Sequence, residues 1–408
     1  MLAEAAQFCD DRGVGPIDLL AAAAASVPLR LRRGVPVPRP VRRLLILGYG
    51  ALGDTIFFLP VLEALRRAYP GAKLTWVSNP APVADVLIPA SGLVDEVRKW
   101  DFEGEEGLAR RPEFIEFASA ADFDAAVLTM STPAHYFAPA LAATPVVAAH
   151  RFSGLTLKRR LILGEPSRAA LGGRAATVLG AEHSVRRNLR LLEALGVSAA
   201  DPLARPALPV GPPARARAAA LLGAGAAPVV GVHLGPPSSY NFRGWAPERF
   251  SAVLAGLARA WPGARFALIG GLDEAPSAAR ALASGPEGML DFVGKTSLFE
   301  AFALIERCAL FISCDTGPSK AAMALGTPTA TLWGPSSPVE SGAYWEPEKH
   351  LDLVAGIWCS PCSFSGMPRD GQLNYLTCGH HACLAEMSAE WVLGRIFARW
   401  PALPKKLR

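Results

Sequence analysis

Asp54 is the first residue with clear potential for chemistry, because it follows a glycine-rich turn at the end of an apolar segment. Residues 44–58 read "LLILGYGALGDTIFF" and place Gly48, Gly50 and Gly53 in the pattern G-x-G-x-x-G. That pattern is typical of a strand-to-helix turn that holds a dinucleotide pyrophosphate. The turn therefore raises two hypotheses: a dinucleotide site, or an aspartate presented for another purpose.

A dinucleotide site also needs an acidic residue roughly 20 positions further on, at the end of the second strand, to bind the ribose 2′-OH. Ser78 and Asn79 occupy that place in "TWVSNP". The Asp54 carboxylate would also repel a pyrophosphate at the same helix amides. We therefore disfavour a dinucleotide and keep two interpretations of Asp54: an aspartate that caps the helix, or a general base.

A second turn with potential for chemistry lies in residues 311–335, "FISCDTGPSKAAMALGTPTATLWGP". An apolar strand is expected to end there and a helix to begin. The first-turn amides of that helix can bind a diphosphate together with the Thr316 hydroxyl and the Lys320 ammonium. A capped helix with a solvated lysine explains the same residues. The turn itself consists of Asp315, Thr316, Gly317 and Pro318.

Both turns belong to alternating strands and helices, which predict a parallel α/β fold. The alternation weakens in the proline-rich "DPLARPALPVGPP" and then restarts with "APVVGVHLG". We therefore predict two doubly wound domains whose strand ends face an interdomain cleft. The expected parts are a leader (1–40), a first domain (41–200), a linker (201–226), a second domain (227–387), and a C-terminal helix and tail (388–408).

The composition limits the class of protein. The chain has 408 residues, 51% of them hydrophobic and 19% charged, which suffices for two buried cores. Its net charge of +5 suits anionic small molecules or an anionic membrane surface, and no motif points to nucleic acid. The sequence shows no signal peptide and no membrane-spanning run, so we expect a cytoplasmic protein. Residues 19–33, apolar and basic, suit either peripheral contact with the inner membrane or ordinary packing.

Four cysteines gather near the C-terminus in the pattern C-x₂-C-x₁₅-C-x-H-H-x-C, which approximates a structural zinc site. Four residues separate the second pair of cysteines, where two are usual. Reduced thiols, zinc and a disulfide all fit the pattern, and we assign no metal. The cysteines are Cys359, Cys362, Cys378 and Cys383.

Taken together, these segments resemble the heptosyltransferase-like glycosyltransferases, glycosyltransferase family 9, which act in lipopolysaccharide assembly. "GALGDTIFFLPVLEALRRAYPGA" is similar to the family's amino-terminal Gly-Asp helix, and "VHLGPPSSYNFRGWAPERFSAVLAGL" to its phosphate-binding loop. "LIGGLDE" matches its turn before an acid. The most specific match runs from "LDFVGKTSLFEAF" through "DTGPSKAAMALGTPTATLWGPSSP".

The resemblance implies two facing Rossmann-like domains of the type called GT-B, with the acceptor bound by the first and the nucleotide sugar by the second. On the acceptor side, Asp54 becomes the base that takes the acceptor hydroxyl's proton, and Gly53 lies beside it. His183, in "EHSVRRNLRLLEALG", would lie near a phosphate of the acceptor, although a solvated helix face is an alternative.

On the donor side, Arg243 stands where the family usually has a lysine that contacts the donor phosphates, and Glu274 would bind the nucleotide ribose. Lys320 stands where a histidine is common. Both departures keep positive charge, although an arginine binds phosphate in a different geometry from a lysine. The residues expected to line the diphosphate are Asp315, Thr316, Gly317 and Pro318.

These residues predict transfer of a sugar from a nucleotide-sugar donor to a lipid-linked or cell-surface glycan, with inversion and without metal or cofactor. Asp54 would act as base, while Arg243, Lys320 and the helix amides would stabilise the leaving diphosphate. "DFD" at residues 122–124 is interpreted as a surface turn rather than a metal-binding pair. Two alternatives stay open: a nucleotide-sugar epimerase on the same fold, and a non-catalytic protein that binds nucleotides or glycans.

Overall fold

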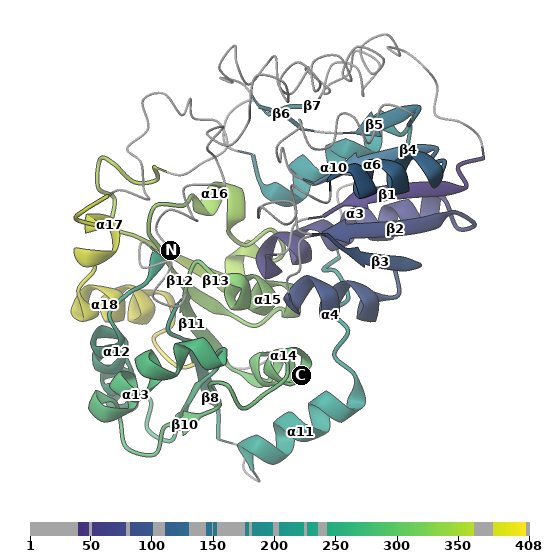
Figure 1. The fold of residues 1–408 in the computed structure, drawn as a ribbon. Coiled ribbons are helices and arrows are strands. Elements are labelled where there is room, and N and C mark those ends of the chain that lie inside the picture. The colour runs from purple at the N-terminus through teal and green to yellow at the C-terminus, as the bar shows by residue number, and fades with distance from the viewer. Residues whose placement is uncertain are drawn as a thin grey trace. The chain divides into compact units, whose positions relative to one another are not determined.

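The computed structural model describes residues 40–48, 51–78, 82–100, 111–129, 144–148, 150–152, 176–178, 182–198, 204–223, 227–235, 243–362 and 378–404. These residues form two compact units, each an α/β structure (Figure 1). The segment from Leu19 to Arg33 lies outside the described residues, as do residues 236–242 of the predicted phosphate-binding loop. None of the described helices is long and apolar enough to cross a membrane.

The first unit contains a five-stranded parallel sheet in the order β3-β2-β1-β4-β5. Its strands are β1 (Arg43–Leu47), β2 (Lys73–Ser78), β3 (Glu96–Lys99), β4 (Ala125–Leu128) and β5 (Val146–Ala148). Its described helices are α3 (Leu52–Ala68), α4 (Pro82–Ser91), α6 (Arg111–Ala120) and α10 (Ser184–Ala194). A separate parallel pair joins β6 (His150–Phe152) to β7 (Ala176–Val178).

Both faces of this first sheet are buried, because parallel strands carry helices on either side. Leu45, Leu47 and Val77 pack with α6 on one face. On the other face, the Trp76 ring meets Phe58 of α3, with centroids 5.9 Å apart. A Cβ added at Gly48 would lie 1.8 Å from the Trp76 ring, so the first glycine of the fingerprint is required by packing.

The second unit contains a six-stranded parallel sheet in the order β10-β9-β8-β11-β12-β13. Its strands are β8 (Val229–His233), β9 (Arg265–Leu268), β10 (Leu290–Asp291), β11 (Leu310–Cys314), β12 (Thr329–Trp333) and β13 (His350–Val354). The longer helices are α11 (Pro212–Leu222), α12 (Pro247–Ala260), α13 (Ala275–Ser284), α14 (Leu298–Arg307), α15 (Gly317–Leu325) and α18 (Ala389–Arg399). The short ones are η3 (Leu272–Glu274), α16 (Pro338–Ser341), η4 (Pro347–Lys349) and α17 (Ala382–Ala385).

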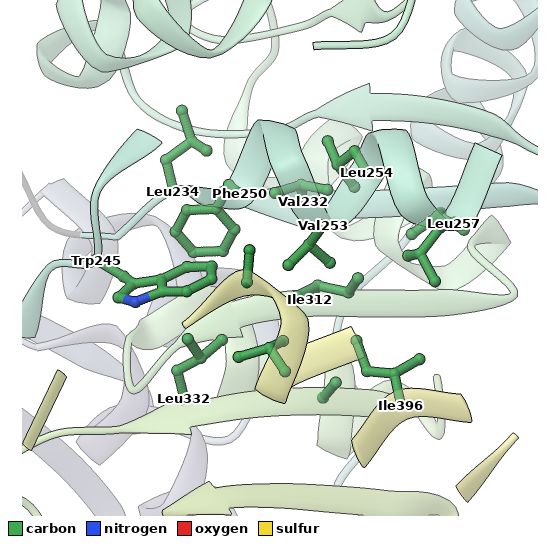
Figure 2. Packing of buried hydrophobic residues seen from close by; sticks show 14 of the residues in the cluster. Val232, Leu234, Trp245, Phe250, Val253, Leu254, Leu257, Ile312, Leu332 and Ile396 are labelled. Carbon is green, nitrogen blue, oxygen red and sulfur yellow. The ribbon is translucent and has the colours of Figure 1, made fainter. Parts of the chain in front are cut away.

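One core of the second unit lies between its sheet and α12, α13 and α18, and Figure 2 shows part of this cluster. Phe250, Val253 and Leu257 of α12 point onto Val232 and Ile312 of the sheet. Every residue of β8, β11 and β12 is buried, as expected for central strands of a parallel sheet. This rigid core holds the strand ends in place.

The expectation of two Rossmann-like domains is confirmed: both sheets are parallel, and their strand order is that of doubly wound folds. The cleft expected between them stays a prediction. One detail differs from the sequence interpretation, since strand β13 was not expected. Helix α11, which lies within residues 201–226, packs against α14 through an Arg215–Glu306 ion pair of 2.8 Å.

His350, at the start of β13, makes the stability of the second unit sensitive to pH. Its Nδ1 lies 2.9 Å from the Thr329 hydroxyl, and burial lowers its pKa from 6.5 to about 4. Between these values the unfolded chain binds a proton that the folded chain does not. The free energy of unfolding should therefore fall by up to about 3 kcal/mol as the pH drops from 6.5 to 4.

Urea unfolding at pH 7 and pH 4.5 measures this effect. His350→Asn, which keeps a polar atom near the position of Nδ1, should show a shallower pH dependence than the wild type. His380→Asn, at an exposed histidine, serves as the control and should follow the wild type. Equal pH dependence in His350→Asn and the wild type would contradict the prediction.

Candidate active site

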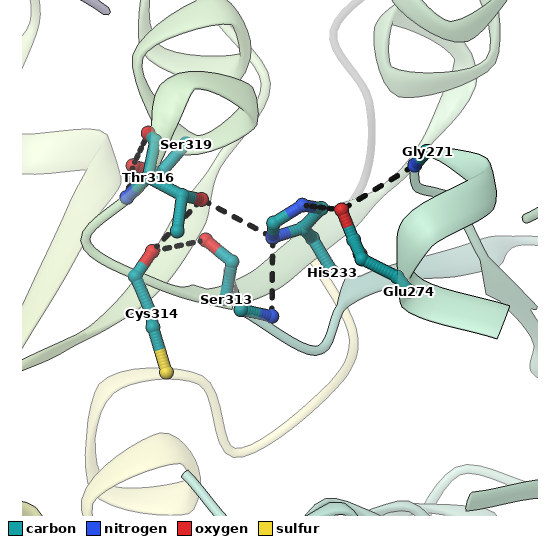
Figure 3. A network of polar contacts seen from close by, with 8 residues as sticks. His233, Gly271, Glu274, Ser313, Cys314, Thr316 and Ser319 are labelled. Atoms are coloured by element: carbon teal, nitrogen blue, oxygen red, sulfur yellow. Dashed lines mark hydrogen bonds and ion pairs between the residues drawn. The ribbon is translucent and has the colours of Figure 1, made fainter. Parts of the chain in front are cut away.

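The candidate site of the second unit lies at the carboxyl ends of its central strands. The strand order reverses between β8 and β11, and ligands of doubly wound sheets bind at this point. His233 ends β8, Glu274 follows β9, and Thr316 follows β11. The fold thus brings together two donor-side residues predicted from the sequence, Glu274 and Thr316, with a histidine between them (Figure 3).

His233 connects these side chains through both of its ring nitrogens. Its Nε2 lies 3.0 Å from Glu274 Oε1, and its Nδ1 lies 3.2 Å from the Thr316 hydroxyl (Figure 3). The backbone N–H of Gly235 donates to Nδ1 at 3.3 Å. Nδ1 is therefore an acceptor, and in the neutral ring Nε2 carries the proton and donates to the carboxylate.

Glu274 is held at the end of the second strand of this unit, where a doubly wound fold places its ribose-binding acid. The residue is only 7% exposed, and Oε1 also accepts the backbone N–H of Gly271 at 3.3 Å. A Cβ at Gly270 would lie 2.3 Å from Oε2, so glycine is needed where the carboxylate approaches the chain. The first unit carries the buried Ser78 at the corresponding strand end.

The start of α15 forms the second part of the site. Thr316 is the N-cap, its backbone N–H donates to the Ser319 hydroxyl at 3.3 Å, and that hydroxyl donates to the Thr316 carbonyl at 2.7 Å. Gly317 and Pro318 are the first helical residues. First-turn amides have no acceptor within their own helix, so the Gly317 amide is oriented as an anion-binding donor.

Asp315 lies directly before this helix start and is buried. Its carboxylate contacts Lys320 Nζ at 2.5 Å, the Ser336 hydroxyl at 2.5 Å and Arg243 Nη1 at 3.6 Å. Burial alone would raise the pKa of Asp315, but Lys320 and Arg243 bring it below its ordinary value. The carboxylate is therefore ionised and held by protein partners.

Lys320 is also buried, at 4% exposure, although it was predicted to lie at the donor phosphates. Its ammonium lies 4.3 Å from the centroid of the Trp333 ring. The Trp333 indole N–H donates to Asp352 Oδ1 at 2.7 Å. Burial lowers the pKa of Lys320, an effect that Asp315 and Asp352 partly offset.

Arg243 is the more accessible cation of the two, because 36% of its side chain is exposed. It follows the loop after β8, which the family resemblance assigns to donor phosphates. Its Nη1 faces the Asp315 carboxylate from the side of this loop. The arrangement places a partly exposed guanidinium near the start of α15.

In the first unit, Asp54 is the third residue of α3, and the N-cap is Ala51. Asp54 is therefore not the helix cap, and it is exposed, while Gly53 beside it is half-buried. His183 is the N-cap of α10, with Nδ1 accepting the N–H of Val185 at 3.2 Å. Its ring lies edge-on to Phe57, with centroids 5.1 Å apart, one turn of α3 after Asp54.

Three polar or aromatic residues of the second unit were missed at the sequence level. The sequence interpretation assigned no role to His233, Trp333 or Ser336. A signal for His233 was present, since it is the last residue of the first strand in this unit and precedes the phosphate-binding loop. Cys314 is no candidate nucleophile, because burial raises the pKa of its thiol to about 12.

The four clustered cysteines are free thiols in this structure. Burial and the neighbouring cysteines raise the pKa of Cys362 and bring that of Cys383 to about 11. Among the described side chains, no three His, Cys, Asp or Glu residues are grouped to hold a metal ion. "DFD" lies in the turn before β4, where Asp124 accepts the backbone N–H groups of Arg42 and Arg43 at 2.6 and 2.9 Å.

Two doubly wound units in one chain are the architecture of GT-B type glycosyltransferases, and the start of α15 and Glu274 follow the strand ends where such a fold binds its ligands. The family model described as "Glycosyltransferase family 9 (heptosyltransferase)" matches residues 162–368. The chain belongs to this family. No curated protein sequence matches the chain.

Solved structures share its fold at low identity. The glycosyl transferase family 9 protein of Veillonella parvula aligns with a TM-score of 0.64 and 19% identity, covering 88% of this chain and 97% of its own. The ADP-heptose lipopolysaccharide heptosyltransferase II of E. coli aligns with a TM-score of 0.62 and 18% identity, and the alignment covers 88% of this chain and 98% of that one. The E. coli heptosyltransferase WaaC with ADP aligns with a TM-score of 0.54 and 22% identity, and the alignment covers 76% of this chain and 92% of that one.

Proposed function

We propose that the protein transfers a sugar, such as a heptose, from a nucleoside-diphosphate sugar to a lipopolysaccharide core or related cell-surface glycan. Glu274 carries the donor part of the proposal. It is buried at the ribose position of a doubly wound unit and stands beside the His233–Thr316 contact at the start of α15. A ribose hydroxyl would donate a hydrogen bond to the Glu274 carboxylate while His233 Nε2 stays bonded to its Oε1 atom.

The diphosphate would bind at the start of α15. The Gly317 amide would donate a hydrogen bond there, the Thr316 hydroxyl would donate once it turns away from His233 Nδ1, and the helix dipole favours negative charge. Arg243 adds a full positive charge next to this position. Together these groups would stabilise the leaving nucleoside diphosphate, so the proposal requires neither a divalent metal nor another cofactor.

The acceptor would bind to the first unit, with Asp54 as the general base. An exposed carboxylate in the first turn of α3 is accessible to an acceptor hydroxyl. Attack on the face of the sugar opposite the diphosphate would invert the anomeric carbon. His183, the N-cap of α10, packs against Phe57 one turn along α3 from Asp54 and would contact a polar group of the acceptor.

The nucleotide and sugar are proposed by analogy with the solved relatives. One of these is named as an ADP-heptose heptosyltransferase, and another holds ADP. A lipid-linked acceptor would bring the protein to the inner face of the membrane as a peripheral protein.

A thermal-shift screen against ADP-, UDP-, GDP- and CMP-sugars tests the donor proposal. The preferred donor should raise the unfolding temperature, because a ligand present at 100 times its Kd stabilises the folded state by about 2.7 kcal/mol. Incubation with the stabilising donor should give new product only when a glycan acceptor is added, and EDTA should not stop it. An epimerised sugar formed from donor alone, or no shift with any donor, would contradict the proposal.

A further inference from the structure

We infer that Lys320 is a positioning residue that neutralises the buried Asp315 carboxylate behind the start of α15 and does not itself contact the donor diphosphate. The inference rests on the proposed nucleotide-sugar site and assigns a different role to the lysine than direct binding of phosphate. Three observations support it: the burial of the Lys320 ammonium, its contacts with Asp315 and Trp333, and the repulsion that an unpaired Asp315 carboxylate would exert on a diphosphate.

The ammonium of Lys320 is enclosed by protein groups. Only 5% of its side chain is exposed, against 36% for Arg243. Nζ lies 2.5 Å from Asp315 Oδ1 on one side and 4.3 Å above the Trp333 ring on the other. A long side chain in a helix leans towards the N-terminus, so Lys320 reaches back to Asp315, the residue before the N-cap of α15.

The Trp333 ring is itself fixed by the next strand. Its indole N–H donates to Asp352 Oδ1 at 2.7 Å, and β12 and β13 are paired in register along their length. This bond holds the negative face of the ring towards the ammonium, the geometry of a cation–π contact. Burial lowers the pKa of Lys320 and raises that of Asp352, while each charge partly compensates the other.

The arrangement resolves a conflict at the proposed diphosphate site. Asp315 directly precedes the anion-binding amides, and an unpaired carboxylate there would repel the donor. With Lys320 behind it, the pair is neutral, and the positive charges of Arg243 and the helix start act on the diphosphate unopposed. The Asp315 carboxylate 2.5 Å away and the face of the Trp333 ring both favour the charged form of the Lys320 amine.

Charge-neutralising variants test this inference. Lys320→Met, Asp315→Asn and the double variant Lys320→Met/Asp315→Asn are each titrated with ADP, UDP and GDP by calorimetry. Lys320→Met should weaken binding about tenfold or more, because the Asp315 charge is exposed to the ligand. The double variant should bind within about threefold of the wild type, since both charges are gone.

A Lys320 that bound the diphosphate directly would give the opposite result, because the double variant would still lack the contact. Loss of about tenfold or more in the double variant therefore overturns the inference, and it does so even if Lys320→Met alone fails to fold. A wild type that binds none of the three nucleotides overturns the proposed function and the inference with it. The matched control is Lys349→Met/Glu346→Gln, just before the first residue of β13. It removes the Lys349–Glu346 ion pair and the 3.4 Å contact between Arg205 and Glu346, and it should leave nucleotide binding unchanged.

Kinetics separate this role from a purely structural one. Lys320→Met should raise the KM for the donor more than it lowers kcat, and adding Asp315→Asn should restore that KM. A general loss of packing would lower kcat and unfolding temperature together, and the second substitution would not restore the KM. Recovery in the double variant is therefore the decisive measurement.

Discussion

Asp54→Asn should lose about 10²–10⁴-fold in kcat, the range expected when a general base is removed. The substitution keeps the size of the side chain and its place in the first turn of α3, but an amide cannot accept the proton of the acceptor hydroxyl. Because the proposed donor site is built from residues of the second unit, nucleotide affinity should stay at the wild-type level. Initial rates with saturating donor and acceptor, together with a nucleotide Kd for the same preparation, measure both quantities.

A structural role for Asp54 would leave a different signature. A first-turn carboxylate opposes the helix dipole and contributes about 0.3–1 kcal/mol to stability, so its loss would lower the unfolding temperature slightly. Asp85→Asn is the matched control, since Asp85 is the first-turn acid of α4 in the same unit and pairs with Lys99 at 2.7 Å. Wild-type turnover by Asp54→Asn would remove the assigned role.

The fold was largely predictable because parallel strands buried on both faces are mostly apolar. The runs ending at Leu47, His233 and Cys314 show this pattern, and the helices between them carry one apolar face. Short or edge strands carry less of this signal. β13 begins with His350 and includes Asp352, a pattern that does not suggest a strand outside its context.

The turns of the candidate site could also be located from the sequence, because glycine, proline and threonine at a strand end predict a helix start. The side chains that these turns contact could not be identified from the sequence. His233 meets Thr316 only because β8 and β11 are neighbours in the sheet, although 83 residues separate the two side chains in the chain. Local patterns do not specify which strands pair across that separation.

Lys320 illustrates the same limit for charge. Four residues into a helix, a lysine is most simply interpreted as solvated or as a phosphate ligand. Its burial depends on Trp333, which arrives from β12, and on Asp352 from β13, which fixes the ring. The sequence showed that a positive charge was present, and the tertiary structure showed which group it faces.

Arg243→Ala should reduce kcat/KM for the donor by about 10²–10³-fold, the cost of removing one group that stabilises a developing charge. Its guanidinium is partly exposed and lies 3.6 Å from Asp315, beside the start of α15. Without it, the diphosphate loses a partly exposed full positive charge, and among the described residues Asp315 keeps Lys320 as its one cationic partner. Arg243→Lys should retain part of the activity, since it restores the charge without the planar pair of donors.

Arg243 and Lys320 should respond differently to removal of the Asp315 charge. If Arg243 contacts the diphosphate, adding Asp315→Asn to Arg243→Ala should not restore donor KM, whereas the same addition should restore it in Lys320→Met. Steady-state rates with varied donor measure both cases. Arg280→Ala is the control. It breaks an exposed 2.7 Å ion pair between Arg280 of α13 and Glu248 of α12, and its rates should match those of the wild type. A kcat/KM within about twofold of wild type for Arg243→Ala, less than 0.5 kcal/mol, would mean that the leaving group is stabilised elsewhere.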